Sequence, residues 1–207
     1  MNHSGTVLAR YYEDSSDTPT EITIEIYNNW LAEEDIDKKR KTIAEFIYHR
    51  LHSRYIKPFQ HNDDNFKTQY KNGFAIMANC CLLIETLQSF REGWPDTEQK
   101  SQKAFKKFFE KDPIFNVNTL SATTFYKHIR CGILHQGETT GGWMINRDPK
   151  KELLEAKTIN ATKFADELDK KLNSYKEELE KSDWDSEVWD NFRTKMRAVI
   201  KNCQSQN

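Results

Sequence analysis

The stretch TLSATTFYKHIRCGILHQGETTGG, residues 119–142, decides the fold predicted for this chain. Its apolar side chains recur at helical spacing, at Ala122, Phe125, Tyr126, Ile129 and Ile133. At about 100° per residue they share one arc, which must face a core. Gly137 is expected to end this helix, because glycine accepts the left-handed backbone of a helix C-terminus and the following Glu-Thr-Thr-Gly-Gly cannot extend it.

Two side chains near the end of this helix suit phosphate chemistry. Arg130 flanks the apolar arc, and His135 lies outside it in the predicted last turn. A guanidinium is planar and permanently charged, while an imidazole can take or give a proton near pH 7, so no metal is required. A second pair, Arg54 and His61, has Pro58 between its members, and proline would break the helix that has to hold them.

The segment Arg-Cys-Gly-Ile-Leu-His at 130–135, followed by a polar glycine-containing turn, resembles the Arg-x4-6-His motif of the HEPN superfamily. Members of that family are helical bundles, commonly dimeric, and many are metal-independent ribonucleases of toxin-antitoxin, abortive-infection and CRISPR-linked systems. The specific part of the resemblance covers about 125–142.

The resemblance implies that Arg130 and His135 are the catalytic pair of an endoribonuclease that uses no cofactor. His135 would take the proton of an RNA 2′-hydroxyl, and Arg130 would neutralise the charge that gathers on the attacked phosphate, leaving a 2′,3′-cyclic phosphate. The implied partners are RNA, a second copy of the chain in a homodimer with a composite active site, and an antitoxin or another defence-system protein.

An alternative is an inactive HEPN-like module that binds RNA, a nucleotide or a protein. Cys131 favours this alternative, because many active members carry Asn, Asp or His directly after the arginine. A third interpretation is a helical assembly protein in which Arg130 and His135 make only structural contacts at a surface or an interface. Loss of RNA cleavage in Arg130→Ala and His135→Ala would single out the enzyme.

Neighbouring polar residues are candidates for substrate contacts or support. The candidates are His128, Cys131, Glu138, Thr139, Lys103 and Lys107. Each also has a plainer interpretation as a solvated surface or turn residue. His128, Cys131 and His135 share one helical side, so we also consider them as three zinc ligands, although three ligands on one helix are a weak signal.

The spacing of the pair raises a geometric question. Residues five apart on an ideal helix are separated by roughly 140° around its axis. Arg130 and His135 would therefore point in different directions, unless the last turn is distorted or two such helices meet across a two-fold axis. Gly132 would permit the close approach of the two helices in the second case.

Composition predicts a single domain, 1–207, with a reduced, cytoplasmic location. The net charge is −1 with 30% charged residues, so any RNA must be bound by a local basic patch. The four cysteines, Cys80, Cys81, Cys131 and Cys203, lack zinc-ribbon spacing, and the first two, in the most apolar stretch, are expected to be small core residues. No signal peptide is recognised, and the apolar run within 66–90 is interpreted as a central helix too short for a membrane span, so no membrane partner is expected.

The fold class is mainly α, a HEPN-like bundle of about five or six helices. A β-rich segment is expected over 1–29, because Ile22, Ile24 and Ile26 alternate with polar residues and 7–12 could pair with them. Core helices, including the motif helix, follow over 30–136. One of them is expected to be capped by Asp96 or Thr97 and to carry Phe105, Phe108 and Phe109 on one side, as core residues. A connection and C-terminal helices occupy 143–207, with 143–147 and 153–159 interpreted as two short strands or an ordered connection.

Overall fold

The computed structural model describes residues 4–13, 16–60, 69, 71–112, 115 and 120–204. Most of these residues are helical, and a small β-hairpin lies near the N-terminus, which confirms the predicted fold class at this coarse level. They group into two compact units that interleave along the sequence. Unit 1 comprises Met1–Arg54, Ser89–Asp96 and Lys171–Asn207, and unit 2 comprises Tyr55–Gln88 and Thr97–Lys170. The assignment of 1–207 to one domain stays a prediction.

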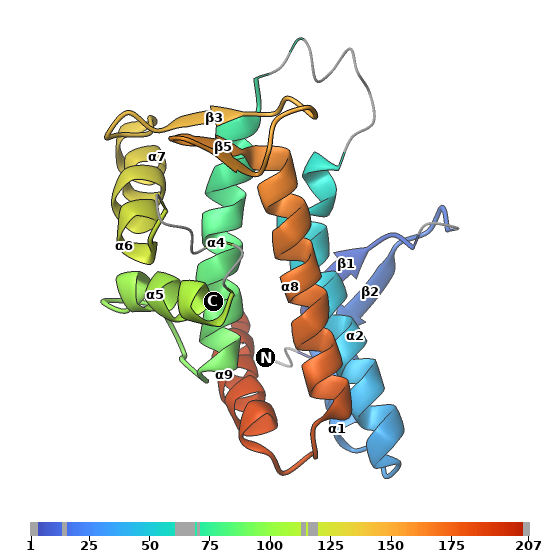
Figure 1. Cartoon of the computed structure of the whole chain (residues 1–207). Coiled ribbons are helices and arrows are strands. Elements are labelled where there is room, and N and C mark those ends of the chain that lie inside the picture. Colours follow the sequence, from blue (N-terminus) through green and yellow to red (C-terminus); the bar gives the residue numbers. More distant parts are fainter. Residues whose placement is uncertain are drawn as a thin grey trace. The chain divides into compact units, whose positions relative to one another are not determined.

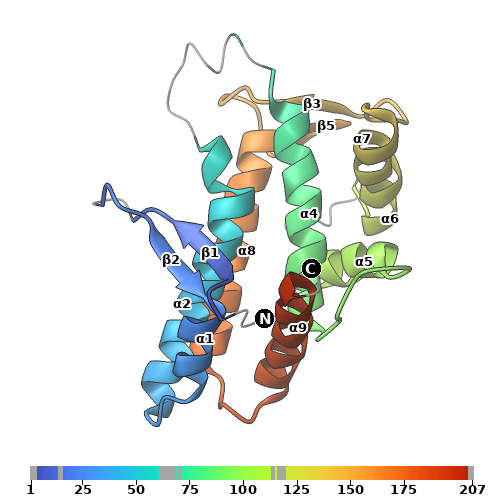
Figure 2. The same cartoon turned by 180° about the vertical axis from the view of Figure 1, so that it is seen from behind.

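Unit 1 contains the hairpin and the helices that pack with it. Strands β1 (Val7–Tyr11) and β2 (Thr20–Thr23) pair antiparallel, with a bulge between Val7 and Ala9. The hairpin lies beside helix α2 (Ile36–Tyr55) in both views (Figures 1 and 2). The Tyr11 ring stacks on His49 at 4.4 Å, and Arg54 Nη2 donates to the Leu8 carbonyl at 3.0 Å. These contacts fix the hairpin to the helix.

The β-rich prediction for 1–29 is wrong from Ile24 onward. Helix α1 spans Ile24–Leu31, and the side chain of Thr23 caps it by accepting from the backbone N–H of Ile26 at 3.3 Å. Ile24 and Tyr27 lie three residues apart on the buried face of this helix. The alternation of Ile22, Ile24 and Ile26 therefore does not indicate one strand, because a capping threonine interrupts it.

The C-terminal residues of unit 1 form an aromatic core. Helix α8 (Ala161–Lys181) contributes its residues from Lys171 onward, and helix α9 (Glu187–Gln204) follows. Trp189 and Phe192 are fully buried, with ring centroids 5.3 Å apart, and Phe192 stacks on Phe90 at 5.7 Å. This burial supplies much of the apolar stabilisation of the unit.

Unit 2 is built around helix α4 (Gly73–Arg91), which belongs to this unit as far as Gln88. By length and composition α4 could cross a membrane, contrary to the expectation from the sequence, but 67% of its apolar window is buried inside the protein. Cys80 and Cys81 are fully buried, as predicted for small core residues, and burial raises the pKa of both thiols. The predicted start of this helix near Phe66 lies outside the described residues.

The short elements of unit 2 are the 3-10 turn η1 (Lys57–Phe59) and a three-stranded sheet after the motif helix. Strand β5 (Thr158–Asn160) lies in the middle, parallel to β3 (Met144–Asn146) and antiparallel to β4 (Leu154–Glu155). Strand β3 lies within 143–147, as the strand interpretation predicted, whereas 153–159, interpreted as a single strand, contains β4 and the first residues of β5. The sheet crosses the N-terminal end of α4 (Figures 1 and 2), where a Cβ on Gly73 would lie 3.0 Å from Ile145 Cγ2, a tight contact.

Helix α5 (Ser101–Lys111) packs its predicted aromatic face into the core of unit 2. The buried rings that surround it are those of Phe105, Phe108, Phe109, Phe115, Phe125 and Phe164. Phe125 makes the connection to the motif helix, with its ring 5.6 Å from Phe105, 5.2 Å from Phe109 and 5.3 Å from Phe164. The core therefore fixes the start of the motif helix against α5 and α8.

Candidate functional site

The motif helix has three parts. It begins as α6 (Ala122–Phe125), continues through the π-helical turn η3 (Tyr126–Arg130) and ends as α7 (Cys131–Gln136). The Ser121 side chain caps it by accepting from the backbone N–H of Thr124 at 3.2 Å. Gly137 ends it in the left-handed conformation, with φ of 70°, as the sequence predicted.

Arg130 and His135 meet within one chain. Arg130 Nη1 lies 3.2 Å from His135 Nε2. A guanidinium carries only donors, so Nε2 is assigned as the acceptor of this hydrogen bond, which places the imidazole proton on Nδ1. The two residues point in different directions from the helix axis, but the long side chain of Arg130 reaches around the helix far enough to contact His135. A second chain is therefore not needed for the pair to meet, and the homodimer stays a prediction.

The guanidinium of Arg130 is held in place by α4. Its Nε donates to Glu85 Oε1 at 2.9 Å, and Thr97 Oγ1 donates to Glu85 Oε2 at 3.3 Å. The ring of Tyr126 lies 5.5 Å from Arg130 Cζ and covers a face of the cation. The side chains of Arg130 and Glu85 are only 16% and 11% exposed, so water screens this ion pair weakly.

The electrostatics of this contact keep Arg130 charged. Burial alone lowers the pKa of its guanidinium, but the hydrogen bond and the charge of Glu85 outweigh burial and raise the pKa above its ordinary value. Arg130 is therefore a fixed cation whose Nη1 is directed at the imidazole of His135, which is exposed to solvent.

The turn after the helix folds back against it. The Glu138 N–H donates to the Gly132 carbonyl at 3.4 Å, and a Cβ on Gly132 would lie 2.4 Å from the Glu138 carbonyl oxygen. The element that lies close to Gly132 is thus the chain's own turn, and the approach of a second helix at this glycine stays a prediction. The turn therefore depends on glycine at this position.

His128 holds the same turn. Its Nδ1 lies 2.8 Å from Thr140 Oγ1, and its backbone carbonyl accepts from the Thr140 N–H at 3.0 Å. Gly141, at φ of 65°, covers the imidazole so closely that a Cβ there would lie 2.7 Å from Nδ1. The half-buried His128 thus has a structural partner in the turn, and its role as a phosphate ligand stays a prediction.

The other candidates on the motif helix and its turn do not gather at His135. Thr139 Oγ1 donates to the Trp143 carbonyl, and in the described part of the chain neither Thr139 nor Glu138 is hydrogen-bonded to His135. Cys131 is half-buried directly after Arg130. The structure does not bring His128, Cys131 and His135 together as a zinc site, because no group of three His, Cys, Asp or Glu residues within the described ranges could hold a metal ion.

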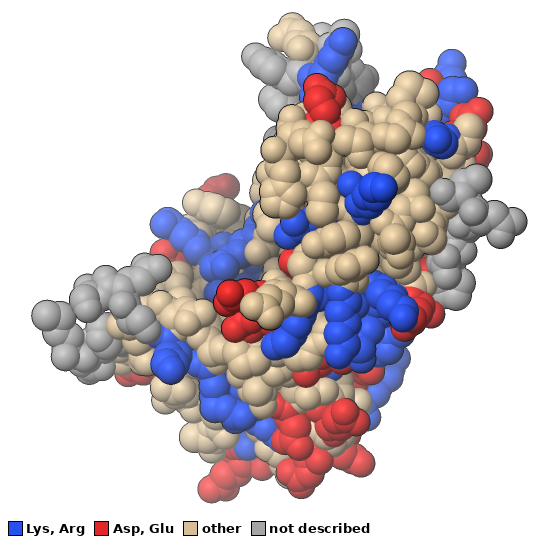
Figure 3. Space-filling model, turned by 90° about the vertical axis from the view of Figure 1, so that its left-hand side faces the viewer, with Lys and Arg blue, Asp and Glu red and all other residues tan. Residues whose placement is uncertain are grey.

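Lys103 and Lys107 both belong to α5, but they have different surroundings. Lys103 is exposed and lines a hollow of about 300 Å³ between α5 and α6, whereas Lys107 is half-buried and does not line it. Figure 3 shows the side on which α5, α6 and α7 lie in Figure 1, where Lys and Arg side chains gather in several places with Asp and Glu side chains next to them. The local basic patch that the near-neutral composition requires therefore stays a prediction.

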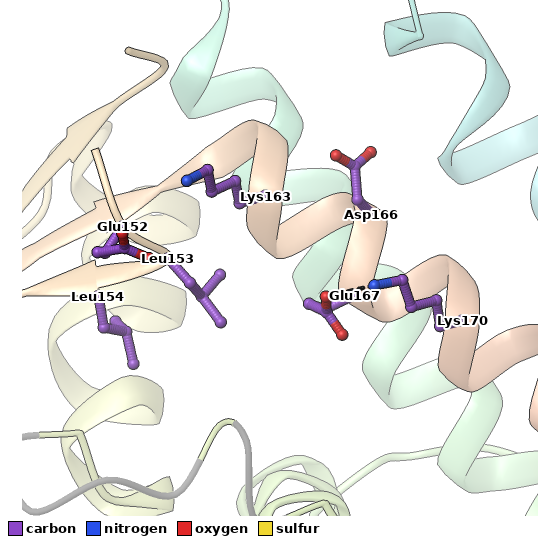
Figure 4. A pocket seen from close by; sticks show the side chains of 7 residues that line it. All are labelled: Glu152, Leu153, Leu154, Lys163, Asp166, Glu167 and Lys170. Atoms are coloured by element: carbon purple, nitrogen blue, oxygen red, sulfur yellow. Dashed lines mark hydrogen bonds and ion pairs between the residues drawn. The ribbon is translucent and has the colours of Figure 1, made fainter. Parts of the chain in front are cut away.

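A larger hollow of about 560 Å³ lies elsewhere in unit 2, between the β4 region and α8. Leu153 and Leu154 lie opposite Glu167 and Lys170, which form an ion pair at 2.6 Å (Figure 4). Its lining holds three carboxylates, Glu152, Asp166 and Glu167, against two lysines, Lys163 and Lys170. Burial raises the pKa of Asp166, and the excess of carboxylates makes this hollow unfavourable for a phosphate.

Sequence reasoning missed three residues of the candidate site: Glu85, Thr97 and Tyr126. Tyr126 is predicted only as part of the apolar face, and Thr97 only as an alternative to Asp96 for capping α5, which begins instead at Ser101. Glu85 did carry a signal, since it is the only charged residue within FAIMANCCLLIETL, the most apolar stretch of the chain. A carboxylate in a buried helix requires a partner, which here is Arg130.

Comparison with known proteins adds no relative, because no family model, curated protein or solved structure matches this chain.

Proposed function

We propose that this chain is a metal-independent endoribonuclease of the HEPN type, with Arg130 and His135 as its catalytic pair. The observation that carries the proposal is the 3.2 Å contact between Arg130 Nη1 and His135 Nε2. A fixed cation and a neutral imidazole that face each other offer one phosphodiester both charge neutralisation and a proton acceptor. The HEPN resemblance at 130–135 supplies the reaction class.

In the proposed reaction the scissile phosphate binds at Arg130, beside the imidazole. The phosphate takes over the Nη1 donor of Arg130, which frees His135 Nε2 from the hydrogen bond seen in the structure. The freed Nε2 takes the proton of the 2′-hydroxyl, the 2′-oxygen forms a bond to phosphorus, and the bond from phosphorus to the 5′-oxygen breaks. The departing 5′-oxygen takes a proton from a protonated His135 of the partner subunit in the proposed homodimer, or otherwise from water. The products are a 2′,3′-cyclic phosphate and a 5′-hydroxyl, so DNA, which lacks the nucleophile, is not cut.

The support of Arg130 by Glu85 fits this role. Charge on the non-bridging oxygens develops only as the reaction proceeds, and a donor that is already oriented need not reorganise at that moment. Glu85 Oε1 accepts from Arg130 Nε at 2.9 Å. The Nη1 and Nη2 donors are on the other two branches of the guanidinium carbon. Glu85 would therefore be a positioning residue and not a catalytic one.

The test is incubation of end-labelled RNA and DNA of the same sequence with purified protein, with and without a chelator. We expect RNA cleavage to a 2′,3′-cyclic phosphate that the chelator does not affect. Arg130→Ala and His135→Ala should each lower the rate by at least about 100-fold, the usual contribution of a general base or an electrostatic donor. Lys127→Ala and Gln136→Ala, exposed neighbours on the same helix, are matched controls that should keep full activity.

A specific observation favours a second function, a HEPN-like module that binds RNA, nucleotide or protein without cutting. Arg130 is only 16% exposed and already ion-paired, which is enough to explain its presence as a structural residue. Cys131 favours the same function. RNA that is bound but left intact by wild-type protein would establish this alternative, and chelator-sensitive cleavage of DNA would contradict both functions.

A further inference from the structure

The hollow between α5 and α6 has the chemistry of an anion site. Its lining residues are Gln99, Gln102, Lys103, Lys106, Ala122 and Thr123. The charges among them are those of the two lysines, and Glu110 Oε1, which is not part of the lining, lies 4.0 Å from Lys106 Nζ. Such an exposed ion pair contributes little, so a phosphate can compete for Lys106. The two amides and the hydroxyl can also donate hydrogen bonds. The larger hollow beside α8 has the opposite charge balance, with three carboxylates and two lysines. A phosphate in unit 2 would therefore favour the α5–α6 hollow over the larger one.

The hollow is connected to the candidate catalytic pair through the packing of the motif helix. Phe105 of α5 lies 5.6 Å from the ring of Tyr126, and that same ring covers the guanidinium of Arg130 at 5.5 Å. Thr123 precedes Arg130 by seven residues of the helix, which at a rise of about 1.5 Å per residue corresponds to about 10 Å along the axis. The hollow and Arg130 thus lie at neighbouring places along one helix.

This separation suits a strand of nucleic acid. About 10 Å spans roughly three nucleotides of a stacked strand at about 3.4 Å each, and fewer when the strand is extended. The lysines and both glutamines are exposed, so a polymer can reach them without any opening of the unit. A mononucleotide bound at Arg130 could not reach the hollow, whereas an oligonucleotide could.

We propose that this hollow is a second phosphate subsite, in which Lys103 and Lys106 bind the RNA backbone within about three nucleotides of the bond that Arg130 and His135 act on. The inference rests on the proposed ribonuclease function and deepens it, since it makes the substrate an RNA longer than a dinucleotide. Lys107, which does not line the hollow, is assigned no part in the subsite.

The first experiment compares a dinucleotide with an octanucleotide RNA as substrates for wild-type protein, the double variant Lys103→Ala/Lys106→Ala and the control Lys111→Ala, an exposed lysine on the same helix. We expect the double variant to raise KM for the octanucleotide about tenfold, as for loss of a charge-assisted hydrogen bond, with kcat and the dinucleotide kinetics unchanged. An octanucleotide KM equal to that of wild type, or an equal loss on both substrates, would overturn the subsite.

The second experiment separates binding from cleavage. An octanucleotide with 2′-O-methyl groups cannot be cut by the proposed reaction, and its affinity is measured by fluorescence anisotropy over a range of salt concentrations. The slope of log affinity against log salt should fall by roughly 0.7 for each phosphate that is no longer neutralised, or about 1.4 in the double variant, with no change in Lys111→Ala. Equal slopes in all three proteins would rule out the subsite. Absence of cleavage of any RNA by wild-type protein would refute the nuclease proposal alone, because the salt slope still decides the subsite.

Discussion

Replacement of Glu85 by alanine is the sharpest test of how the candidate site is held together. The carboxylate accepts from Arg130 Nε at 2.9 Å and from Thr97 Oγ1 at 3.3 Å, and the Glu85 side chain is 11% exposed. Its removal leaves a weakly hydrated guanidinium without its anion and Thr97 without its acceptor. A hydrogen bond to a charged group contributes about 1.5–3 kcal/mol, and the loss of one partner of a fully buried pair costs about 3–5 kcal/mol.

Because Arg130 retains some exposure to water, we expect Glu85→Ala to lower the free energy of unfolding by about 2–3 kcal/mol. Glu85→Gln retains a carbonyl oxygen that can accept from Arg130 Nε and loses only the charge, so about 1 kcal/mol is expected. Urea denaturation followed by circular dichroism measures both values. If the protein is a nuclease, Glu85→Ala should also lower kcat more than KM, because a misaligned guanidinium fails mainly in the transition state.

The matched control is Glu110→Ala on α5. Glu110 is 60% exposed and lies 4.0 Å from Lys106, so its ion pair should contribute less than about 0.5 kcal/mol. A Glu85→Ala protein whose free energy of unfolding lies within about 0.5 kcal/mol of wild type would show that Arg130 does not depend on Glu85, and the proposed support of the site would then have to be abandoned.

Three further outcomes are expected. Gly132→Ala should lower the free energy of unfolding by about 2 kcal/mol in urea titration, because its Cβ would lie 2.4 Å from the Glu138 carbonyl oxygen. Alanine is otherwise the better helix former, so a variant at least as stable as wild type would show that the turn moves away without cost. Burial lowers the pKa of His49, so the unfolded chain binds the proton more readily than the folded chain. The free energy of unfolding should therefore fall as the pH drops below the ordinary histidine pKa of about 6.5. The difference between the urea midpoints at about pH 7.5 and pH 5.5 should be smaller in His49→Gln than in wild type, and an equal difference would contradict this role of His49. Phe125→Ala should cost about 3–5 kcal/mol, since it empties the centre of the aromatic core, and a loss below about 1 kcal/mol would mean that the core collapses around the gap.

Local signals in the sequence account for the parts of the fold that were predicted correctly. Glycine at 137 ends the motif helix as expected, because few other residues accept its left-handed backbone. The aromatic residues of α5 and the adjacent cysteines of α4 are buried because their spacing and apolar surroundings leave no other place for them. The error at Ile24 arose because alternation and helical spacing coincide over so short a run, and only the capping threonine separates them.

The contacts of the candidate site were harder to predict. Glu85 lies 45 positions before Arg130, and no periodicity connects residues so far apart in the sequence. The meeting of Arg130 with His135 depends on the reach of one flexible side chain, which helix angles do not describe. A buried carboxylate in an apolar helix indicates only that a cation is needed, and it leaves open which of the many lysines and arginines supplies it.

The π-helical turn at Tyr126–Arg130 places the two ends of the motif helix out of phase by one residue. Phe125, the last residue of α6, can therefore point into the core while Arg130, the last residue of the π-helical turn, points toward Glu85 of α4. In a regular α-helix the directions of these two side chains would be fixed relative to each other in a different way. Shortening the turn by a single residue would restore regular winding and rotate everything after it by about 100°. Arg130 and His135 would then keep their spacing from each other, but Arg130 would no longer point at Glu85. The π-helical turn therefore sets the rotation of the pair about the helix axis relative to α4.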